Sequence, residues 1–242
     1  MHDLLNGKTA VIFDVDGTVV DSLGVWNQVD VLLAAQLGNV AMPSEKLFAF
    51  REASLAAHSA EENPYEAYCG DLGRLYESDL DAKTIHAMRF AISRTEIAKH
   101  VKLRDGVADV LQFLKRRGIT MAVATTTKLA NVNIYCDVNE AIRSELNLRE
   151  IFDFFLTKED VTAIKPDPEV YLKAVKKLRV DKKEILVVED SVTGLKAARA
   201  AGLDVLVVRE EHSLQDESYL RRESSGYAES FQDVLRDWSK LP

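Results

Sequence analysis

The sequence predicts an α/β fold, a doubly wound parallel sheet with an inserted helical domain. Two observations predict it. Over residues 101–242, short runs of apolar and β-branched residues alternate with amphipathic helical patterns, which is typical of parallel strands joined by helices. Over residues 23–100, helical patterns follow one another with little strand signal, so this block interrupts the alternation after the first strand. We therefore expect a core domain of residues 1–22 and 101–242 and a helical cap domain of residues 23–100.

The core elements are expected in a simple order. The run "TAVIF" at residues 9–13 is short, apolar and partly β-branched, and predicts the first buried strand. One helix opens with Asp167 as N-cap and Pro168 at its first position, and Gly202 ends a later one. The polar stretch 210–230 is expected to be a surface connection. The other strands are expected at 120–125, 152–156, 184–190 and 204–208, and helices at 107–118, 139–148, 167–178, 193–202 and 229–238.

The inserted block contains four separate helical patterns. They cover residues 23–38, 44–58, 64–80 and 82–100. Because the block follows the first strand directly, we expect it to form a second lobe at the carboxyl edge of the sheet. Open parallel sheets bind their ligands at that edge, so the lobe would border the ligand site.

Composition limits the classes of function. The formal net charge is −8, so the chain lacks the basic excess that nucleic-acid-binding proteins use against phosphates. No apolar run reaches membrane-spanning length and the N-terminus lacks a signal-peptide pattern. We therefore expect a cytoplasmic protein with neither a nucleic-acid nor a membrane partner. Cys69 and Cys136 lie far apart and form no metal-ligand pair, which suits a reducing compartment.

Polar side chains follow three of the predicted strands, at the point where each strand ends. They are Asp14 and Asp16 after the first strand, Thr125, Thr126 and Thr127 after the second, and Glu189 and Asp190 after the fourth, with Lys165 just before a helix. Because the carboxyl ends of parallel strands share one edge of a sheet, we expect these side chains to meet. Clustered carboxylates repel one another unless a cation compensates, and Mg²⁺ prefers oxygen ligands. Lysine and threonine suit phosphoryl oxygens, so the pattern predicts a magnesium and phosphoryl site.

Four segments resemble the motifs of the haloacid dehalogenase superfamily, in that family's order. They are "DVDGTVVDS", "AVATTT", "KPDPEVY" and "VVEDSVTGLKAARAAG". The resemblance covers about the whole chain, and the helical block resembles the α-helical cap of the phosphatase and phosphomutase branch. It implies a Rossmann-like core, a hydrolase acting on phosphoric monoesters, and Mg²⁺ as cofactor.

The resemblance also implies a role for each matching residue. Asp14 matches the nucleophile that becomes an aspartyl-phosphate, and Asp16 matches the general acid and base. The implied metal ligands are the Asp14 carboxylate, the Asp16 backbone carbonyl and Asp190, with Glu189 bound directly or through water. The implied phosphoryl ligands are Thr125 and Lys165, with a further contact from Thr126. Thr127 is expected to be an ordinary cap hydroxyl.

Two features depart from the family's pattern or match it faintly. The segment after Thr127 is longer than usual, so the loop around residues 131–139 is expected to be distinctive. Arg51 faintly resembles a cap arginine that contacts substrate in sugar-phosphomutase relatives. The surrounding match is poor, so we expect Arg51 to be an exposed, salt-bridged arginine and keep it as a candidate specificity residue in the alternative interpretation.

The leading functional prediction is a Mg²⁺-dependent phosphatase that hydrolyses a small phosphorylated metabolite through an aspartyl-phosphate. A sugar phosphomutase similar to β-phosphoglucomutase shares the chemistry but returns the phosphoryl group to its substrate. A phospho-accepting signalling module of the receiver type is a third alternative. It is disfavoured because receiver domains place their acidic pair before the accepting aspartate, whereas here a pair, Glu189 and Asp190, follows Lys165.

Overall fold

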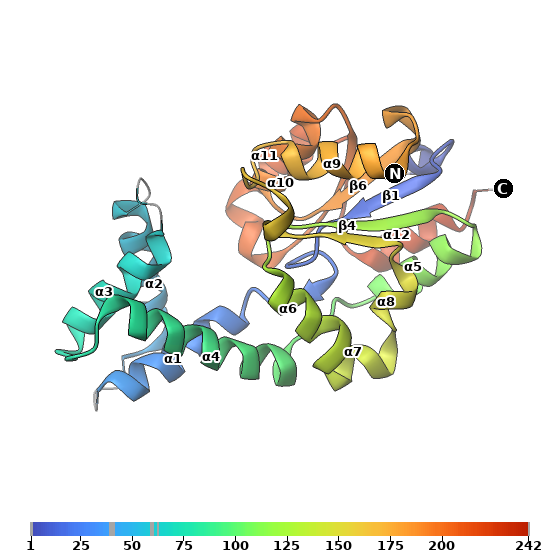
Figure 1. The fold of residues 1–242 in the computed structure, drawn as a ribbon. Coiled ribbons are helices and arrows are strands. Elements are labelled where there is room, and N and C mark those ends of the chain that lie inside the picture. Colours follow the sequence, from blue (N-terminus) through green and yellow to red (C-terminus); the bar gives the residue numbers. More distant parts are fainter. Residues whose placement is uncertain (1, 39–41, 59–60, 62, 242) are drawn as a thin grey trace. The chain divides into compact units, whose positions relative to one another are not determined.

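The computed structural model describes residues 2–38, 42–58, 61 and 63–241. The chain forms two compact units (Figure 1). Met1–Asp21 and Val101–Pro242 form the first, which we call the α/β unit, and Ser22–His100 form the second, the helical unit.

The α/β unit is built on a six-stranded sheet in the order β5-β4-β1-β6-β7-β8. Every neighbouring pair is parallel, which confirms the predicted fold class. The strands are β1 (Ala10–Phe13), β4 (Thr120–Ala124), β5 (Phe154–Leu156), β6 (Ile185–Glu189), β7 (Asp204–Val208) and β8 (Gly226–Ala228). The sixth strand lies inside the stretch 210–230, so the prediction of a plain surface connection there was wrong. That stretch also contains a 3₁₀ helix, Glu211–Asp216, and the helix α11, Glu217–Glu223.

The register of the central strands aligns their ends. Phe13 of β1 lies opposite Val123 of β4 on one side and Val188 of β6 on the other. The residues that directly follow these three positions therefore reach the same edge of the sheet. This edge is where the polar residues of the sequence pattern begin.

Helices cover both faces of the sheet (Figure 1). One face packs against α9 (Glu169–Leu178), α10 (Val192–Ala200) and α11, and their apolar side chains share one buried core with β1, β6 and β7. The opposite face carries α5 (Val107–Arg116) and α12 (Phe231–Trp238), which contact each other. Burial on both faces explains why the central strands read as continuous apolar runs rather than alternating ones.

The chain between β4 and β5 is more elaborate than expected. It forms α6 (Leu129–Asn133), a π-helical turn (Ile134–Val138), α7 (Glu140–Glu145) and α8 (Leu148–Ile151). The single helix predicted at 139–148 was therefore wrong. The Asn139 side chain caps α7 by accepting from the Ile142 amide, and Asn147 likewise caps α8, so two N-cap signals divide this segment into two helices.

Two short strands flank the helical unit in the sequence, one before it and one after it. β2 (Val20–Asp21) and β3 (Lys102–Leu103) pair antiparallel, with Val20 opposite Leu103. Short 3₁₀ helices occupy His2–Leu5, Lys158–Asp160 and Lys182–Glu184. The antiparallel pair brings together the two places where the chain leaves and re-enters the α/β unit.

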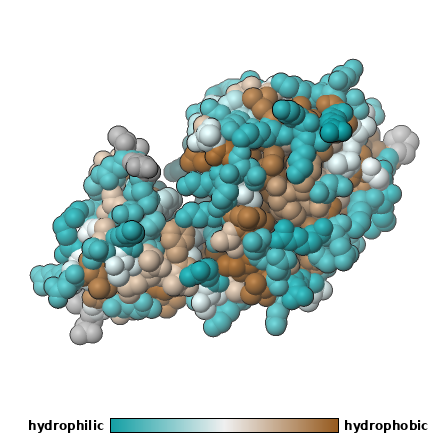
Figure 2. All heavy atoms as spheres, in the orientation of Figure 1, coloured by the Kyte–Doolittle hydropathy of each residue, from teal (hydrophilic) through white to brown (hydrophobic). Residues whose placement is uncertain are grey.

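The helical unit contains α1 (Val25–Leu37), α2 (Ser44–Ala57), α3 (Pro64–Leu75) and α4 (Ala82–His100). Its apolar core includes Leu33, Leu47, Tyr68, Leu72 and Ile85. On the face that Figure 2 shows, hydrophilic residues predominate over this unit, with weakly hydrophobic ones among them. Within the described residues, no helix combines the length and the apolar character that crossing a membrane requires.

Candidate active site

A buried ammonium group links two carboxylates at the carboxyl edge of the sheet. Lys165 Nζ donates to Asp14 Oδ1 at 2.6 Å and to Glu189 Oε1 at 2.7 Å. Asp14 follows β1, Glu189 ends β6, and Lys165 lies in the loop before α9. All three are buried, Glu189 completely. The structure therefore brings together three residues that the sequence placed on separate segments.

Local hydrogen bonds hold the loop that presents Lys165. The Glu169 carboxylate, in the first turn of α9, accepts from the backbone amides of Thr162 and Ala163 at 2.9 and 2.8 Å. An acidic side chain at a helix N-terminus also interacts favourably with the helix dipole. Glu169 thereby anchors the approach to Lys165 onto the helix that follows.

At this cluster, burial and the neighbouring charges shift the pKa values of the side chains in opposite directions. Burial raises the pKa of Asp14 to about 7, although the Lys165 ammonium opposes the rise. Burial alone would lower the pKa of Lys165, but the charges of Asp14 and Glu189 outweigh it and hold that pKa well above its usual value. Burial would likewise raise the pKa of Glu189, yet Lys165 keeps it low. Lys165 is thus protonated, and of the two acids that it binds, Asp14 is the less compensated.

Glu189 is fixed by several donors besides Lys165. The Tyr171 hydroxyl donates to Glu189 Oε1 at 2.6 Å, and the Ser191 hydroxyl donates to Oε2 at 3.1 Å. The Asp190 amide donates to the same Oε2 at 3.1 Å. A β-carbon on Gly194 would lie 1.8 Å from Oε1, so only glycine leaves room for this carboxylate. Both oxygens of Glu189 are therefore used to hold Lys165 and the turn after β6.

Asp190 is a second buried carboxylate next to this cluster. The Thr18 hydroxyl donates to Asp190 Oδ1 at 2.7 Å. Burial, together with the charges of Glu189 and Asp14, raises the pKa of Asp190 well above its usual value. Asp190 is thus close enough to sense the charge of Asp14, and its own charge lacks a matching cation at this edge.

The turn after β1 gives Asp16 a separate environment. Gly17 adopts φ +83°, a conformation that other residues rarely tolerate, and the Arg104 guanidinium donates to its carbonyl at 2.7 Å. The Tyr135 hydroxyl donates to Asp16 Oδ1 at 2.6 Å, and the Thr127 hydroxyl donates to Oδ2. Asp16 is therefore oriented by two hydroxyls, whereas Asp14 is oriented by an ammonium group.

The three threonines that follow β4 differ in burial and in hydrogen-bond partners. Thr125 is buried, and its hydroxyl accepts from the Thr127 amide at 3.2 Å. Thr126 is half-buried. Thr127 was expected to be an ordinary cap hydroxyl, yet it contacts the Asp16 carboxylate. Its position two residues after Thr125 gave no signal of that contact, which only the fold establishes.

Arg51 lies in the helical unit, within a cluster of its own. Its guanidinium donates to Asp30 Oδ2 at 2.7 Å and to Asn27 Oδ1 at 3.0 Å. Arg89 donates to the other oxygen of Asp30, also at 2.7 Å. Arg51 is only 8% exposed, so the expectation of an exposed arginine was wrong, although the salt bridge is present.

The chemistry of the donor set fits Mg²⁺. Within the described residues, no three or more His, Cys, Asp or Glu side chains are grouped to hold a metal by themselves. Mg²⁺ needs fewer, because it is usually held by one or two carboxylates and keeps waters and substrate phosphate. Asp14, Glu189 and Asp190 present three carboxyl groups against the single ammonium of Lys165. The pKa values of Asp14 and Asp190 are raised, and a divalent cation bound beside them would favour their ionised forms.

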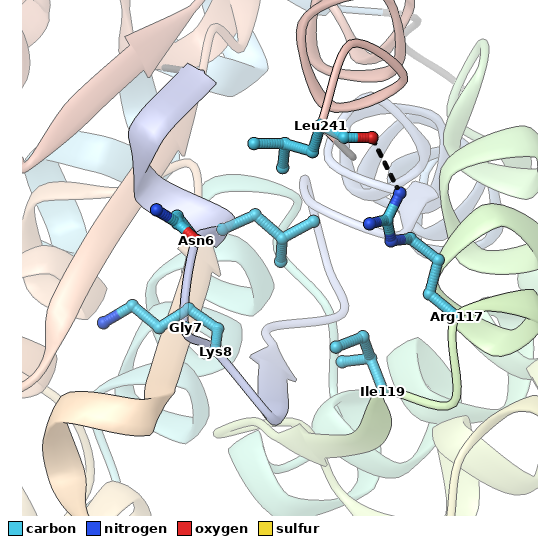
Figure 3. Close-up of a pocket in the computed structure, with 7 residues that line it drawn as sticks. Asn6, Gly7, Lys8, Arg117, Ile119 and Leu241 are labelled. Atoms are coloured by element: carbon cyan, nitrogen blue, oxygen red, sulfur yellow. Dashed lines mark hydrogen bonds between the residues drawn. The ribbon is translucent and has the colours of Figure 1, made fainter.

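A hollow of about 240 Å³ lies elsewhere (Figure 3). Leu5 and Lys8 line it just before β1, and Ile119 lines it just before β4. It therefore lies at the amino edge of the parallel strands, opposite the edge that carries Asp14. The Lys8 ammonium contacts Asp204 at 2.6 Å, so this charge is already paired. The hollow is lined by none of the candidate site residues.

Comparison with known proteins shows the family to which the chain belongs. The sequence profile of the haloacid dehalogenase-like hydrolases matches residues 8–202, which confirms the resemblance carried by the four motifs. The protein CbbY from Cereibacter sphaeroides is 40% identical over 107 residues, 44% of this chain and 45% of that protein. The phosphorylated carbohydrates phosphatase of Thermotoga maritima is 34% identical over 116 residues, 48% of this chain and 50% of that protein. The matched chain thus spans about half the length of these two curated relatives.

Structural similarity extends further along the chain. A proposed β-phosphoglucomutase from Thermotoga maritima superimposes with a TM-score of 0.78 at 25% identity. The match covers 96% of this chain and 99% of that one. The architecture is therefore shared over both units.

Proposed function

Because this chain belongs to the haloacid dehalogenase-like hydrolase family, we propose that it is a Mg²⁺-dependent phosphatase of small phosphorylated sugars. The observation that carries the proposal is the buried Asp14 carboxylate, held by Lys165 at 2.6 Å beside the uncompensated Asp190. The substrate class is suggested by the Thermotoga phosphatase, which is named for phosphorylated carbohydrates.

Asp14 is the proposed nucleophile. One of its carboxylate oxygens attacks the phosphorus, an O–P bond to Asp14 forms, and the bond from phosphorus to the sugar oxygen breaks. Lys165 already orients Asp14, and its charge offsets the negative charge that gathers on the transferring group. Water then attacks the aspartyl-phosphate, which releases inorganic phosphate and restores the carboxylate.

Asp16 is the proposed general acid and base. It gives a proton to the departing sugar oxygen in the first step and takes one from water in the second. Two different carboxyl groups are needed because the nucleophile must be ionised while the acid must carry a proton. Asp14 is held by an ammonium group and Asp16 by two hydroxyls, so the two carboxyl groups are positioned independently of each other.

The remaining site residues bind the phosphoryl group and the metal. Lys165 and Thr125 are proposed to contact the phosphoryl oxygens, with a further contact from Thr126. The proposed metal ligands are the Asp14 carboxylate, the Asp16 backbone carbonyl and Asp190. Bound Mg²⁺ would neutralise the phosphoryl charge and the excess carboxylate charge. Glu189 was a candidate ligand, but both its oxygens already accept hydrogen bonds, so we propose that it holds Lys165 instead.

The helical unit is proposed to act as the cap that sets specificity and excludes water from the reaction. A cytoplasmic location is likewise part of the proposal. Arg51 has Asp30 and Asn27 as partners inside the helical unit, which supports a structural role over direct substrate contact.

The test is phosphate release from a panel of sugar phosphates and 4-nitrophenyl phosphate. We expect turnover with Mg²⁺, none with chelator, and a loss of at least about 10³-fold in kcat for Asp14→Asn, because removing a covalent nucleophile leaves little catalysis. Asp109→Asn, an exposed aspartate on α5, is the matched control and should keep wild-type activity. Full activity in Asp14→Asn would refute the nucleophile.

A phosphomutase is the second candidate, favoured by the match to the Thermotoga structure. It would use the same aspartyl-phosphate but transfer the phosphoryl group to another hydroxyl of the sugar. Phosphorus NMR of a hexose 1-phosphate, with and without a hexose bisphosphate primer, separates the two. A phosphatase accumulates inorganic phosphate in both samples, whereas a mutase gives the 6-phosphate and depends on the primer.

A further inference from the structure

Asp16 receives a hydroxyl on each of its carboxylate oxygens, and the two hydroxyls differ in exposure. Tyr135, which donates to Oδ1 at 2.6 Å, is only 1% exposed. Thr127, which donates to Oδ2, is half-buried. Oδ1 is thus held by a buried tyrosine, and Oδ2 is held by a more exposed threonine.

Tyr135 comes from the π-helical turn Ile134–Val138, in the segment whose length departs from the family's pattern. The turn is closed by the Asn139 amide, which donates to the Ile134 carbonyl at 2.8 Å. A π-turn adds one residue to a helical turn, so it changes which side chains face a given direction, and such turns are frequent at functional sites. Here the side chain that it directs onto Asp16 is a tyrosine.

Hydrogen bonds made by residues on both sides of Tyr135 stabilise the π-helical turn. The Arg149 guanidinium bonds the Asp137 carboxylate at 2.7 Å and Asn133 Oδ1 at 2.7 Å. The Asn139 side chain donates to the Val101 carbonyl at 2.8 Å. Residues before, within and after the turn are thus tied to other parts of the α/β unit, so the Tyr135 hydroxyl is held in place rather than carried on a loose loop.

We propose that Tyr135 is a positioning residue that fixes Asp16 for proton delivery to the leaving group. This inference rests on the proposed phosphatase function. Tyr135 keeps Oδ1 as an acceptor, which leaves Oδ2 as the oxygen that carries and transfers the proton. The Thr127 hydroxyl has lone pairs and can accept from the protonated Oδ2 until a leaving oxygen takes its place.

Tyr135 would act on one step, the cleavage of the bond between phosphorus and the sugar oxygen. As the phosphorus–oxygen bond to the sugar breaks, the proton on Asp16 Oδ2 moves to the departing oxygen, which leaves as an alcohol. A sugar alkoxide is a poor leaving group and needs that proton, whereas nitrophenolate leaves well without one. A misplaced Asp16 therefore slows transfer from an alkyl phosphate far more than transfer from an aryl phosphate.

The experiment compares kcat/KM for a sugar phosphate and for 4-nitrophenyl phosphate in Tyr135→Phe, which removes only the hydroxyl. This parameter reports the steps through first phosphoryl transfer, so slow hydrolysis of the aspartyl-phosphate does not mask the effect. We expect a fall of about 10- to 100-fold for the sugar phosphate and less than about threefold for the aryl phosphate. Because both substrates are measured on one preparation, any loss of folded protein cancels in their ratio.

Two further variants complete the test. Tyr219→Phe, on α11, removes a tyrosine hydroxyl far along the chain and should leave the ratio unchanged. In an Asp16→Asn background, Tyr135→Phe should no longer change the ratio, because no proton remains to deliver. Equal falls for both substrates, or no fall for either, would overturn the role of Tyr135. An inactive wild type, or an active Asp14→Asn, would instead overturn the proposed function.

Discussion

The two units each bury a cluster of three charged side chains, with opposite composition. In the α/β unit, one ammonium, Lys165, lies between the carboxylates of Asp14 and Glu189. In the helical unit, one carboxylate, Asp30, lies between two guanidinium groups. The first cluster carries excess negative charge and the second excess positive charge, so neither is balanced by its own members.

The clusters differ in how completely their groups are satisfied. Both oxygens of Asp30 accept hydrogen bonds, and the Arg89 guanidinium also lies over the rings of Trp26 and Tyr65, at 4.8 and 5.3 Å. Stacked, forked contacts of this kind suit arginine and rigidify a site. In contrast, burial raises the pKa of Asp14 to about 7, although the Lys165 ammonium opposes the rise. We infer that the helical cluster stabilises its unit, whereas the core cluster is the one proposed to bind a metal and a phosphoryl group.

The largest expected effect on stability comes from removing the shared carboxylate of the helical cluster. Asp30→Asn removes the carboxylate that two buried guanidinium groups share, while Arg51 keeps its ion pair with Glu52 at 3.3 Å. Breaking a buried ion pair costs about 3–5 kcal/mol. Urea unfolding followed by circular dichroism measures the loss. Asp79→Asn, an exposed aspartate of the same unit, should change the free energy of unfolding by less than about 0.5 kcal/mol. Equal stabilities of the two variants would show that the helical cluster is not structural.

Removing the shared cation of the core cluster should act on turnover instead. Lys165→Met takes away a group proposed to bind the transferring phosphoryl oxygens, and we expect kcat to fall by about 10²- to 10³-fold. Lys176→Met removes an exposed lysine from the neighbouring helix α9 and serves as the control. Phosphate release at saturating substrate and Mg²⁺ measures both. If Lys165→Met kept the wild-type kcat, the core cluster would have a structural role, like the helical cluster, rather than a catalytic one.

The core cluster could be predicted from the sequence, and the helical cluster could not. Asp14 and Asp190 each follow an apolar, β-branched run, and parallel strands bring such ends to one edge. The same reasoning predicted β1, β4, β5, β6 and β7 of the sheet but not β8. Asp30, Arg51 and Arg89 lie on three different helices, and their pairing depends on how those helices pack. No local pattern records that packing. Of these three residues, the sequence analysis singled out only Arg51, because it faintly resembles a cap arginine that contacts substrate.

Other parts of the structure also escaped the sequence patterns. β8 has only three residues, too few for a recognisable run in a polar stretch. The helix expected to open at Pro168 begins one residue later at Glu169, although Asp167 does accept from the Glu169 amide at 2.9 Å. Tyr135 contacts Asp16 across 119 residues of sequence, and the unusual length of its segment was the only available signal. Long-range hydroxyl contacts are set by the tertiary fold rather than by spacing.

The smallest expected effect distinguishes a structural Arg51 from a substrate-binding one. In Arg51→Lys the charge is kept, but a lysine ammonium cannot contact Asp30 and Asn27 in the fork geometry of a guanidinium. We expect a loss of about 1 kcal/mol in the free energy of unfolding, the usual size for a lost hydrogen bond, with KM for a sugar phosphate unchanged. Arg74→Lys, at an exposed pair on α3, should change neither quantity. If KM rose while the free energy of unfolding stayed constant, Arg51 would instead bind the substrate, and the helical cluster would owe its excess positive charge to an anionic ligand.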